Sequence, residues 1–202
     1  MRIISQLLGT GIVATALVSA VATSAVAQET TVKDLRADVV QYSVDDDLDP
    51  GTILDGPTSI ATGIDATSAR VKHTKKSVAI QMRFADLTTD KTFTYAGIRV
   101  RGAKTWPSYW VQSNGSKTKG AVYDRNFKRL CSATFTTRSG ESGWINVVVP
   151  RSCINKPKEI KVKVWVVREP QQDPDDVQTF LEESVSPTTY KSASWTTWLK
   201  SS

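Results

Sequence analysis

Residues 77–85 read SVAIQMRFA, and every second side chain from the second onward is apolar: Val78, Ile80, Met82 and Phe84. Residues 159–167 read EIKVKVWVV and repeat the pattern, with Lys161 and Lys163 between apolar neighbours. A period of two is typical of an antiparallel strand with one buried side and one side in water. These two stretches decide the fold class, because neither has the 3.6-residue period of an amphipathic helix.

The rest of the chain offers further short strands separated by turn signals. Strands are expected at 39–44, 68–73, 91–95, 98–101, 109–112, 121–123, 132–137 and 144–149. Turn signals stand at Asp55-Gly56-Pro57, Asn114-Gly115, Ser139-Gly140, Ser142-Gly143 and Lys156-Pro157. Many short strands at near-regular spacing predict an all-β, antiparallel β-sandwich, immunoglobulin-like or jelly-roll-like. A closed barrel is the alternative.

The composition fits one domain behind an export signal. The chain has 202 residues, of which 40% are hydrophobic and 23% charged, too apolar for intrinsic disorder. Residues 1–27 combine Arg2, a long uncharged run and the small-x-small exit Ala25-Val26-Ala27, which predicts a signal peptide. An uncleaved anchor is the alternative, because the run approaches spanning length. We expect cleavage after Ala27, a single domain over 28–202, and a secreted or cell-surface protein with no membrane span.

The charge is unevenly distributed along the chain. Without residues 1–27 it keeps 25 basic and 20 acidic residues, a net charge of +5. Bases crowd the middle, between Lys72 and Arg129, whereas acids gather in 45–55 and 173–183. In an exported protein, a basic surface favours an anionic cell-wall polymer or phospholipid headgroups over nucleic acid. A merely solubilising surface is the alternative.

The two cysteines, Cys131 and Cys153, are expected to form a disulfide, because the exported compartment is oxidising. The bond would close a loop of about 22 residues and contribute about 3 kcal/mol. A zinc site is not expected, because two cysteines and the lone His73 do not supply four ligands.

Residues 45–51 read DDDLDPG and place carboxylates at alternate positions, as a calcium loop does. The complete loop pattern fails, because Pro50 stands where the sharp turn needs glycine and Gly56 replaces the final glutamate. Ca²⁺ is therefore the one cofactor that the sequence suggests. The alternative is a solvated acidic loop that binds no metal. Its candidate ligands are Asp45, Asp47 and Asp49.

Residues 106–110 read WPSYW and supply the candidate ligand-binding rings. An extended chain places Tyr109 and Trp110 on opposite faces, so one of them lies outside the core. Exposed rings beside polar side chains are suited to stacking on sugars. Trp106, Tyr109 and Trp110 are therefore predicted stacking groups, and core packing under a covering loop is the alternative.

Residues 169–202 form an acidic, proline-containing C-terminal extension of the same domain. A short helix is expected around 177–183. Trp195 and Trp198 are expected to dock on the sandwich, because Trp165 and Val167 interrupt the polar face of their strand and need cover.

No catalytic residue is predicted. A Ser-His-Asp set would have to use His73, and no serine stands in a G-x-S-x-G turn, so we expect a structural or surface histidine. A glycosidase needs only two carboxylates about 5–9.5 Å apart, which leaves a carboxylate-based hydrolase as a minor alternative to a non-enzyme.

Five segments carry a family resemblance, namely DVV at 38–40, ARVKHT at 69–74, SVAIQMRFADL at 77–87, VPRSC at 149–153 and SWTTW at 194–198. With these segments the chain resembles a group of small exported proteins of unassigned function from high-GC Gram-positive bacteria, which are similar in pattern to carbohydrate-binding modules. The resemblance implies export and a β-sandwich, and it implies no activity.

Export, fold class and aromatic residues together favour a non-enzymatic binding module for a cell-envelope or extracellular glycan. The hypothesis uses the rings for stacking and basic side chains for anionic substituents. A structural or protein-interaction module of the cell surface is the alternative, and a broad apolar patch would be its mark.

Overall fold

The computed structural model describes residues 27–34, 37–43, 51–90, 92–104, 107–113, 118–169, 179–186 and 193–202, with the backbone alone for 43 and 179–183. Several predictions fall outside these residues: the signal peptide up to residue 26, the calcium ligands Asp45, Asp47 and Asp49, the turn at 114–115, and Trp106.

Strands are the main secondary structure of the described chain. The strands are β1 Gln28–Lys33, β2 Val40–Ser43, β3 Thr52–Ile53, β4 Ala66–His73, β5 Ser77–Phe84, β6 Asp86–Leu87, β7 Thr92–Val100, β8 Tyr109–Ser113, β9 Lys119–Asp124, β10 Arg129–Arg138, β11 Gly140–Glu141, β12 Trp144–Pro150, β13 Glu159–Arg168, β14 Thr179–Ser184 and β15 Leu199–Lys200. Two short helices, α1 Gly56–Ala61 and the 3₁₀ turn η1 Arg151–Ile154, complete the list.

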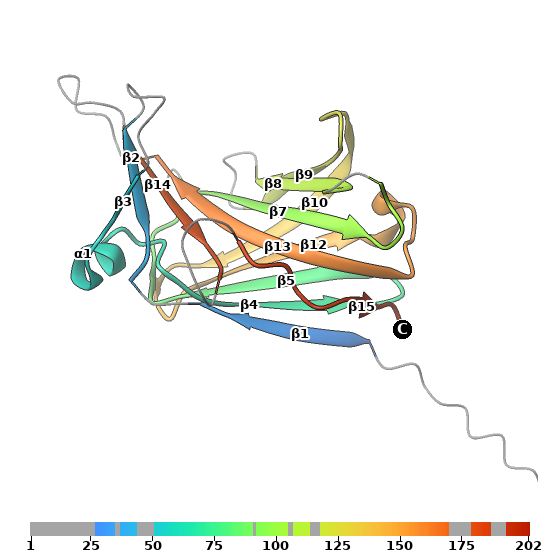
Figure 1. The fold of residues 1–202 in the computed structure, drawn as a ribbon, viewed down its shortest axis with the longest axis horizontal. Coiled ribbons are helices and arrows are strands. Elements are labelled where there is room, and N and C mark those ends of the chain that lie inside the picture. The colour runs from blue at the N-terminus through green and yellow to red at the C-terminus, as the bar shows by residue number, and fades with distance from the viewer. Residues whose placement is uncertain are drawn as a thin grey trace, which may run out of the picture.

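One antiparallel sheet runs in the order β1-β4-β5-β12-β10-β9-β8-β7-β13-β14-β2-β3, and β6 and β11 pair separately. It folds over on itself until it is nearly closed, which gives the sandwich-like, all-β fold that the alternation predicts (Figure 1). Strand β13 is central, because it pairs with β7 along its whole length. Its other edge pairs with β14 at one end and with β15 at the other.

The core lies between the two halves of this sheet. The alternating apolar residues of the two quoted stretches point into it, and none of these eight is more than 3% exposed: Val78, Ile80, Met82, Phe84, Ile160, Val162, Val164 and Val166. Burying each such side chain contributes about 1.5–3 kcal/mol. The alternating pattern of β5 and β13 is therefore confirmed by the side chains that it buries.

The C-terminal residues close the gap between β13 and the first strands. The Thr196 amide donates to the Val162 carbonyl at 2.9 Å, and the Val162 amide donates to the Thr196 hydroxyl at 3.0 Å. Beyond them, the Lys200 amide donates to the Gln28 side chain of β1 at 2.6 Å. The tail thus packs on the sandwich as expected, as the red strand between β13 and β4 shows in Figure 1.

Two local predictions about helices need correction. The short helix expected around 177–183 is wrong, because 179–184 pair with β13 and β2 as strand β14. A free edge of β13 offers a full ladder of backbone hydrogen bonds, which outweighs the weak helical tendency of so short a segment. Conversely, α1 begins where only a turn was expected. Asp55 caps it by accepting from the Thr58 amide at 2.8 Å, and Pro57 suits the first turn.

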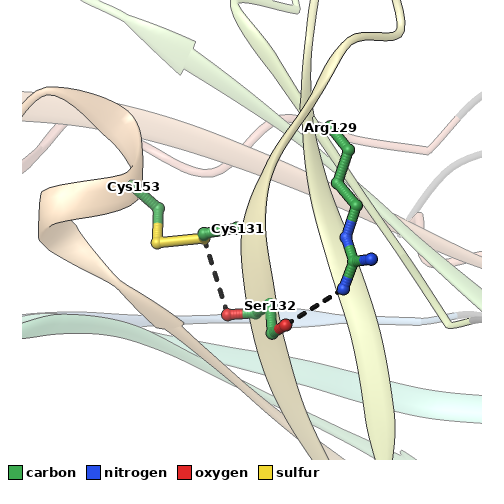
Figure 2. Close-up of a disulfide and its surroundings, with 4 residues drawn as sticks. All are labelled: Arg129, Cys131, Ser132 and Cys153. Carbon is green, nitrogen blue, oxygen red and sulfur yellow. Dashed lines mark hydrogen bonds between the residues drawn. A yellow bond between two sulfur atoms is a disulfide. The ribbon is translucent and has the colours of Figure 1, made fainter.

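The expected disulfide joins Cys131 on β10 to Cys153 on η1 (Figure 2). Beside it, Arg129 Nη2 donates to the Ser132 hydroxyl at 3.1 Å. The Cys131 sulfur also lies 3.5 Å from the Ser132 carbonyl oxygen, which is a van der Waals contact because a disulfide sulfur carries no hydrogen. The bond fixes η1 against the strand that begins at the β9–β10 hairpin.

Within the part of the chain that the structure describes, no helix has the length and apolar character needed to cross a membrane.

Candidate ligand-binding face

The outer face of β13, β7 and β8 gathers aromatic side chains. Cross-strand partners share a face, and the register pairs Trp165 with Tyr95, and Gly97 with both Lys163 and Trp110. The side chains at these positions alternate with buried neighbours and are only partly covered. We call the following set the aromatic stripe: Tyr95, Trp110, Trp165, Trp195 and Trp198.

The three rings of the stripe that lie on the sheet contact one another directly. Tyr95 and Trp165 stack with centroids 5.5 Å apart and planes 12° apart. Trp110 meets Trp165 edge-on, at 5.6 Å and 84°. Such pairs add about 0.5–1.5 kcal/mol to their buried area. The rings therefore form a preorganised surface rather than independent, mobile side chains.

Gly97 explains why the stripe can be so dense in the middle. A Cβ atom at this position would lie 3.3 Å from both Lys163 Cγ and Pro107 Cβ. The missing side chain lets these two neighbours converge over the strand, next to Trp110, which is its cross-strand partner.

Cationic groups lie against the stripe. The Lys163 ammonium is 5.2 Å from the centroid of Trp165 and 5.5 Å from that of Trp195, so it bridges the sheet and the tail. Around Trp198, the guanidinium of Arg101 lies at 4.6 Å and the ammonium of Lys161 at 5.2 Å. Cation–π contacts of this kind contribute about 0.5–2 kcal/mol each. They fix the two tail rings, and they keep positive charge on the same face.

The structure separates the predicted stacking residues. Trp110 belongs to the stripe, whereas Tyr109 packs against the core, with its hydroxyl accepting from Asn155 Nδ2 at 3.1 Å. The two side chains do lie on opposite faces, as predicted. Trp110 is thus partly exposed on the outer face beside Trp165 and Phe127, whereas Tyr109 is turned toward the core.

Sequence reasoning missed Tyr95, both as a member of the stripe and as a ring that contacts Trp165. Tyr95 and Trp110 contact Trp165 directly. The tail ring of Trp195 is linked to Trp165 through Lys163, which lies against both rings. The signal was present in EIKVKVWVV, where Lys161, Lys163 and Trp165 share the polar side. What was missing was the register that sets Tyr95 beside Trp165.

His73 is a buried structural residue. Its side chain is fully inaccessible, and Nδ1 lies 3.0 Å from the Leu199 carbonyl oxygen. A carbonyl only accepts, so Nδ1 carries the proton and donates it. Burial lowers the pKa of His73 below its ordinary value, the Leu199 contact opposes this shift, and the charge of Arg151 adds to it.

One pair of carboxylates stands side by side elsewhere. Glu141 of β11 is the register partner of Asp86 of β6, and both line an open hollow of about 480 Å³ together with Arg83. Both acids are exposed to solvent. Among the described residues, no group of three or more His, Cys, Asp or Glu side chains is placed to hold a metal ion.

The chain matches no protein-family model, no curated protein and no solved structure.

Proposed function

We propose that the protein is a secreted, non-enzymatic binding module that holds a cell-envelope or extracellular glycan on its aromatic stripe. The observation that carries the proposal is the stripe itself: five partly covered rings on one face, fixed by ring–ring and cation–π contacts. A soluble domain does not need aromatic side chains on its outer face for its own core. Such rings instead offer flat, low-entropy surfaces for the apolar faces of sugars.

The cations of the same face suggest the chemistry of the glycan. Lys161 and Lys163 are held over rings by the sheet, so little rotamer entropy is lost when they contact a ligand. Phosphate, carboxylate or sulfate groups on a polysaccharide would complement them. An anionic polysaccharide therefore fits this surface better than a neutral one.

Export is part of the proposal. The disulfide fits an oxidising compartment, and the expected signal peptide would take the chain there.

A protein partner is the second candidate, since Trp, Tyr and Arg are also the residues that dominate protein interfaces. The stripe consists of Trp and Tyr, and Arg101 lies against it, but Lys161 and Lys163 also lie against its rings, and protein interfaces tend to exclude lysine.

The test incubates the chain from residue 28 onward with insoluble cell-wall and polysaccharide fractions and measures the protein that sediments. Trp110→Ala is expected to weaken binding to one fraction about tenfold, which corresponds to about 1.4 kcal/mol of lost stacking. Trp144→Ala is the matched control, because Trp144 is a partly exposed ring on β12, away from the stripe.

Equal losses in the two variants would show that the stripe is not the binding surface. Sedimentation with no fraction at all would overturn the glycan proposal and favour a protein partner.

A further inference from the structure

The turn between β9 and β10 carries a second unusual surface. We call residues 125–130 the basic hairpin tip; all six are exposed, and three of them are cations, Arg125, Lys128 and Arg129. The hairpin projects from the body of the sheet (Figure 1). Its tip therefore stands clear of the labelled strands of the sheet, where it can meet a large partner.

Phe127 is placed in water by an irregular backbone. The backbone φ of Phe127 is 57°, in the left-handed region that favours glycine or asparagine. The residue is 67% exposed. Asp124 holds the turn by accepting from the amides of Asn126 at 2.8 Å and Lys128 at 2.9 Å. One face of the Phe127 ring stacks on Trp110 at 6.1 Å, and the rest faces solvent. The turn itself would favour a different residue at this position.

Leu130 is exposed by a second irregularity only three residues later. The β9–β10 register shifts between Arg129 and Cys131, which leaves Leu130 as the extra residue of a bulge, 41% exposed. Bulges re-aim side chains and are common at functional sites. Two backbone irregularities in four residues thus each present a large apolar side chain to water.

The surroundings of these side chains define the partner. The three cations outnumber the one carboxylate of the turn, that of Asp124, so the field at the tip is positive. A branched aliphatic side chain such as Leu130 does not stack on a sugar ring. It does enter the apolar zone beneath lipid headgroups, where aromatic rings also settle.

We propose that the basic hairpin tip docks on an anionic lipid surface, with Phe127 and Leu130 entering the headgroup boundary and Arg125, Lys128 and Arg129 contacting lipid phosphates. Each Lys or Arg near such a surface adds a similar amount of binding free energy. The two apolar side chains alone bury too little area for stable binding. Binding therefore needs both the charges and the apolar pair. This inference does not rest on the glycan proposal.

The test measures sedimentation of the chain from residue 28 onward with vesicles of phosphatidylcholine alone and of phosphatidylcholine mixed equally with phosphatidylglycerol. The wild type is expected to bind only the mixed vesicles. The triple variant Arg125→Gln, Lys128→Gln, Arg129→Gln is expected to bind them roughly a hundredfold more weakly. The double variant Phe127→Asn, Leu130→Thr is expected to bind about tenfold more weakly.

Matched controls distinguish an effect of the basic hairpin tip from a general effect of surface charge or of exposed apolar side chains. Lys72→Gln, Lys75→Gln, Lys76→Gln removes the same charge from the exposed end of the β4–β5 hairpin, and Ile53→Thr, Ile60→Thr removes two other exposed apolar side chains. Both controls are expected to bind like the wild type. Because asparagine suits a positive φ, Phe127→Asn should not lower the thermal unfolding temperature, which excludes misfolding as the cause.

Three results would overturn the proposal: no vesicle binding by the wild type, equal binding to both kinds of vesicle, or an equal loss in the β4–β5 control. Tip variants that keep vesicle binding but lose binding to wall fractions would assign the tip to the glycan surface instead. Loss of vesicle binding with intact wall-fraction binding would leave the glycan proposal standing.

Discussion

The buried imidazole of His73 on β4 donates a hydrogen bond to the carbonyl of Leu199 on β15, and so ties the C-terminus to the other side of the core. Among the described residues, Nε2 of the same ring has no hydrogen-bond partner. The ring is therefore suited to being neutral, with the proton on Nδ1. A second proton would create a buried charge without compensation.

Stability should consequently fall in mild acid. The pKa of His73 is lowered in the folded state from its ordinary value of 6.5, so the unfolded chain binds the proton more readily. Its contribution is complete above pH 6.5 and is lost as the pH falls from there through the folded-state pKa. Urea unfolding at a series of pH values measures this slope. His73→Leu should reduce the slope across that window; an unchanged slope would assign the acid sensitivity to other groups.

Thr196 should be the residue that holds the tail. Thr196→Val keeps the shape but leaves the buried Val162 amide without its acceptor, which should cost about 1–3 kcal/mol in the free energy of unfolding. Thr197→Val is the matched control, because Thr197 is exposed and uses only its carbonyl, as the acceptor for the Thr196 hydroxyl. Equal unfolding free energies for the two variants would mean that the tail contributes little to the fold.

Gly120 should tolerate no side chain. A Cβ there would overlap Phe135 Cε2 and lie 2.6 Å from the Gln112 carbonyl oxygen, so the Phe135 ring and β8 would both have to move. Gly120→Ala should lower the free energy of unfolding by about 1–3 kcal/mol. Gly56→Ala serves as the control, since among the described residues its Cβ would meet only Ala37 Cβ, at 3.6 Å. Chemical denaturation of both variants decides the matter, and a smaller effect at Gly120 than at Gly56 would contradict the packing argument.

Local sequence patterns predict those strands that bury one face and expose the other. The alternation in β5 and β13 predicts strands because one side of each is dry. It cannot predict that β15, a two-residue strand, closes the gap beside β13, because that pairing depends on partners far away in the chain. The same limit applies to β14. Its strand conformation is determined by pairing with the edge of β13 and not by the secondary-structure propensity of its own residues.

The candidate site was predictable only in part, for a related reason. The alternation places Tyr109 and Trp110 on opposite faces, but it does not say which face is dry. The register shows the outcome, because Trp110 lies opposite Gly97 on the outer face and meets Trp165 edge-on. A contact between three strands requires the register of all three, which periodicity within each strand does not contain.

Lys163 should decide which polysaccharides bind. Its ammonium lies between the rings of Trp165 and Trp195, so Lys163→Met keeps much of the packing while removing the charge. If the ligand is an anionic glycan, this variant should bind it several-fold more weakly and with a shallower dependence on salt, while binding to neutral polysaccharides should stay unchanged. Affinity measured at several ionic strengths tests this, with Lys75→Met, on the exposed β4–β5 turn, as the control. A parallel loss toward neutral and acidic polysaccharides would mean that Lys163 serves only to pack the two tryptophans, and that the stripe recognises sugar rings without regard to their charge.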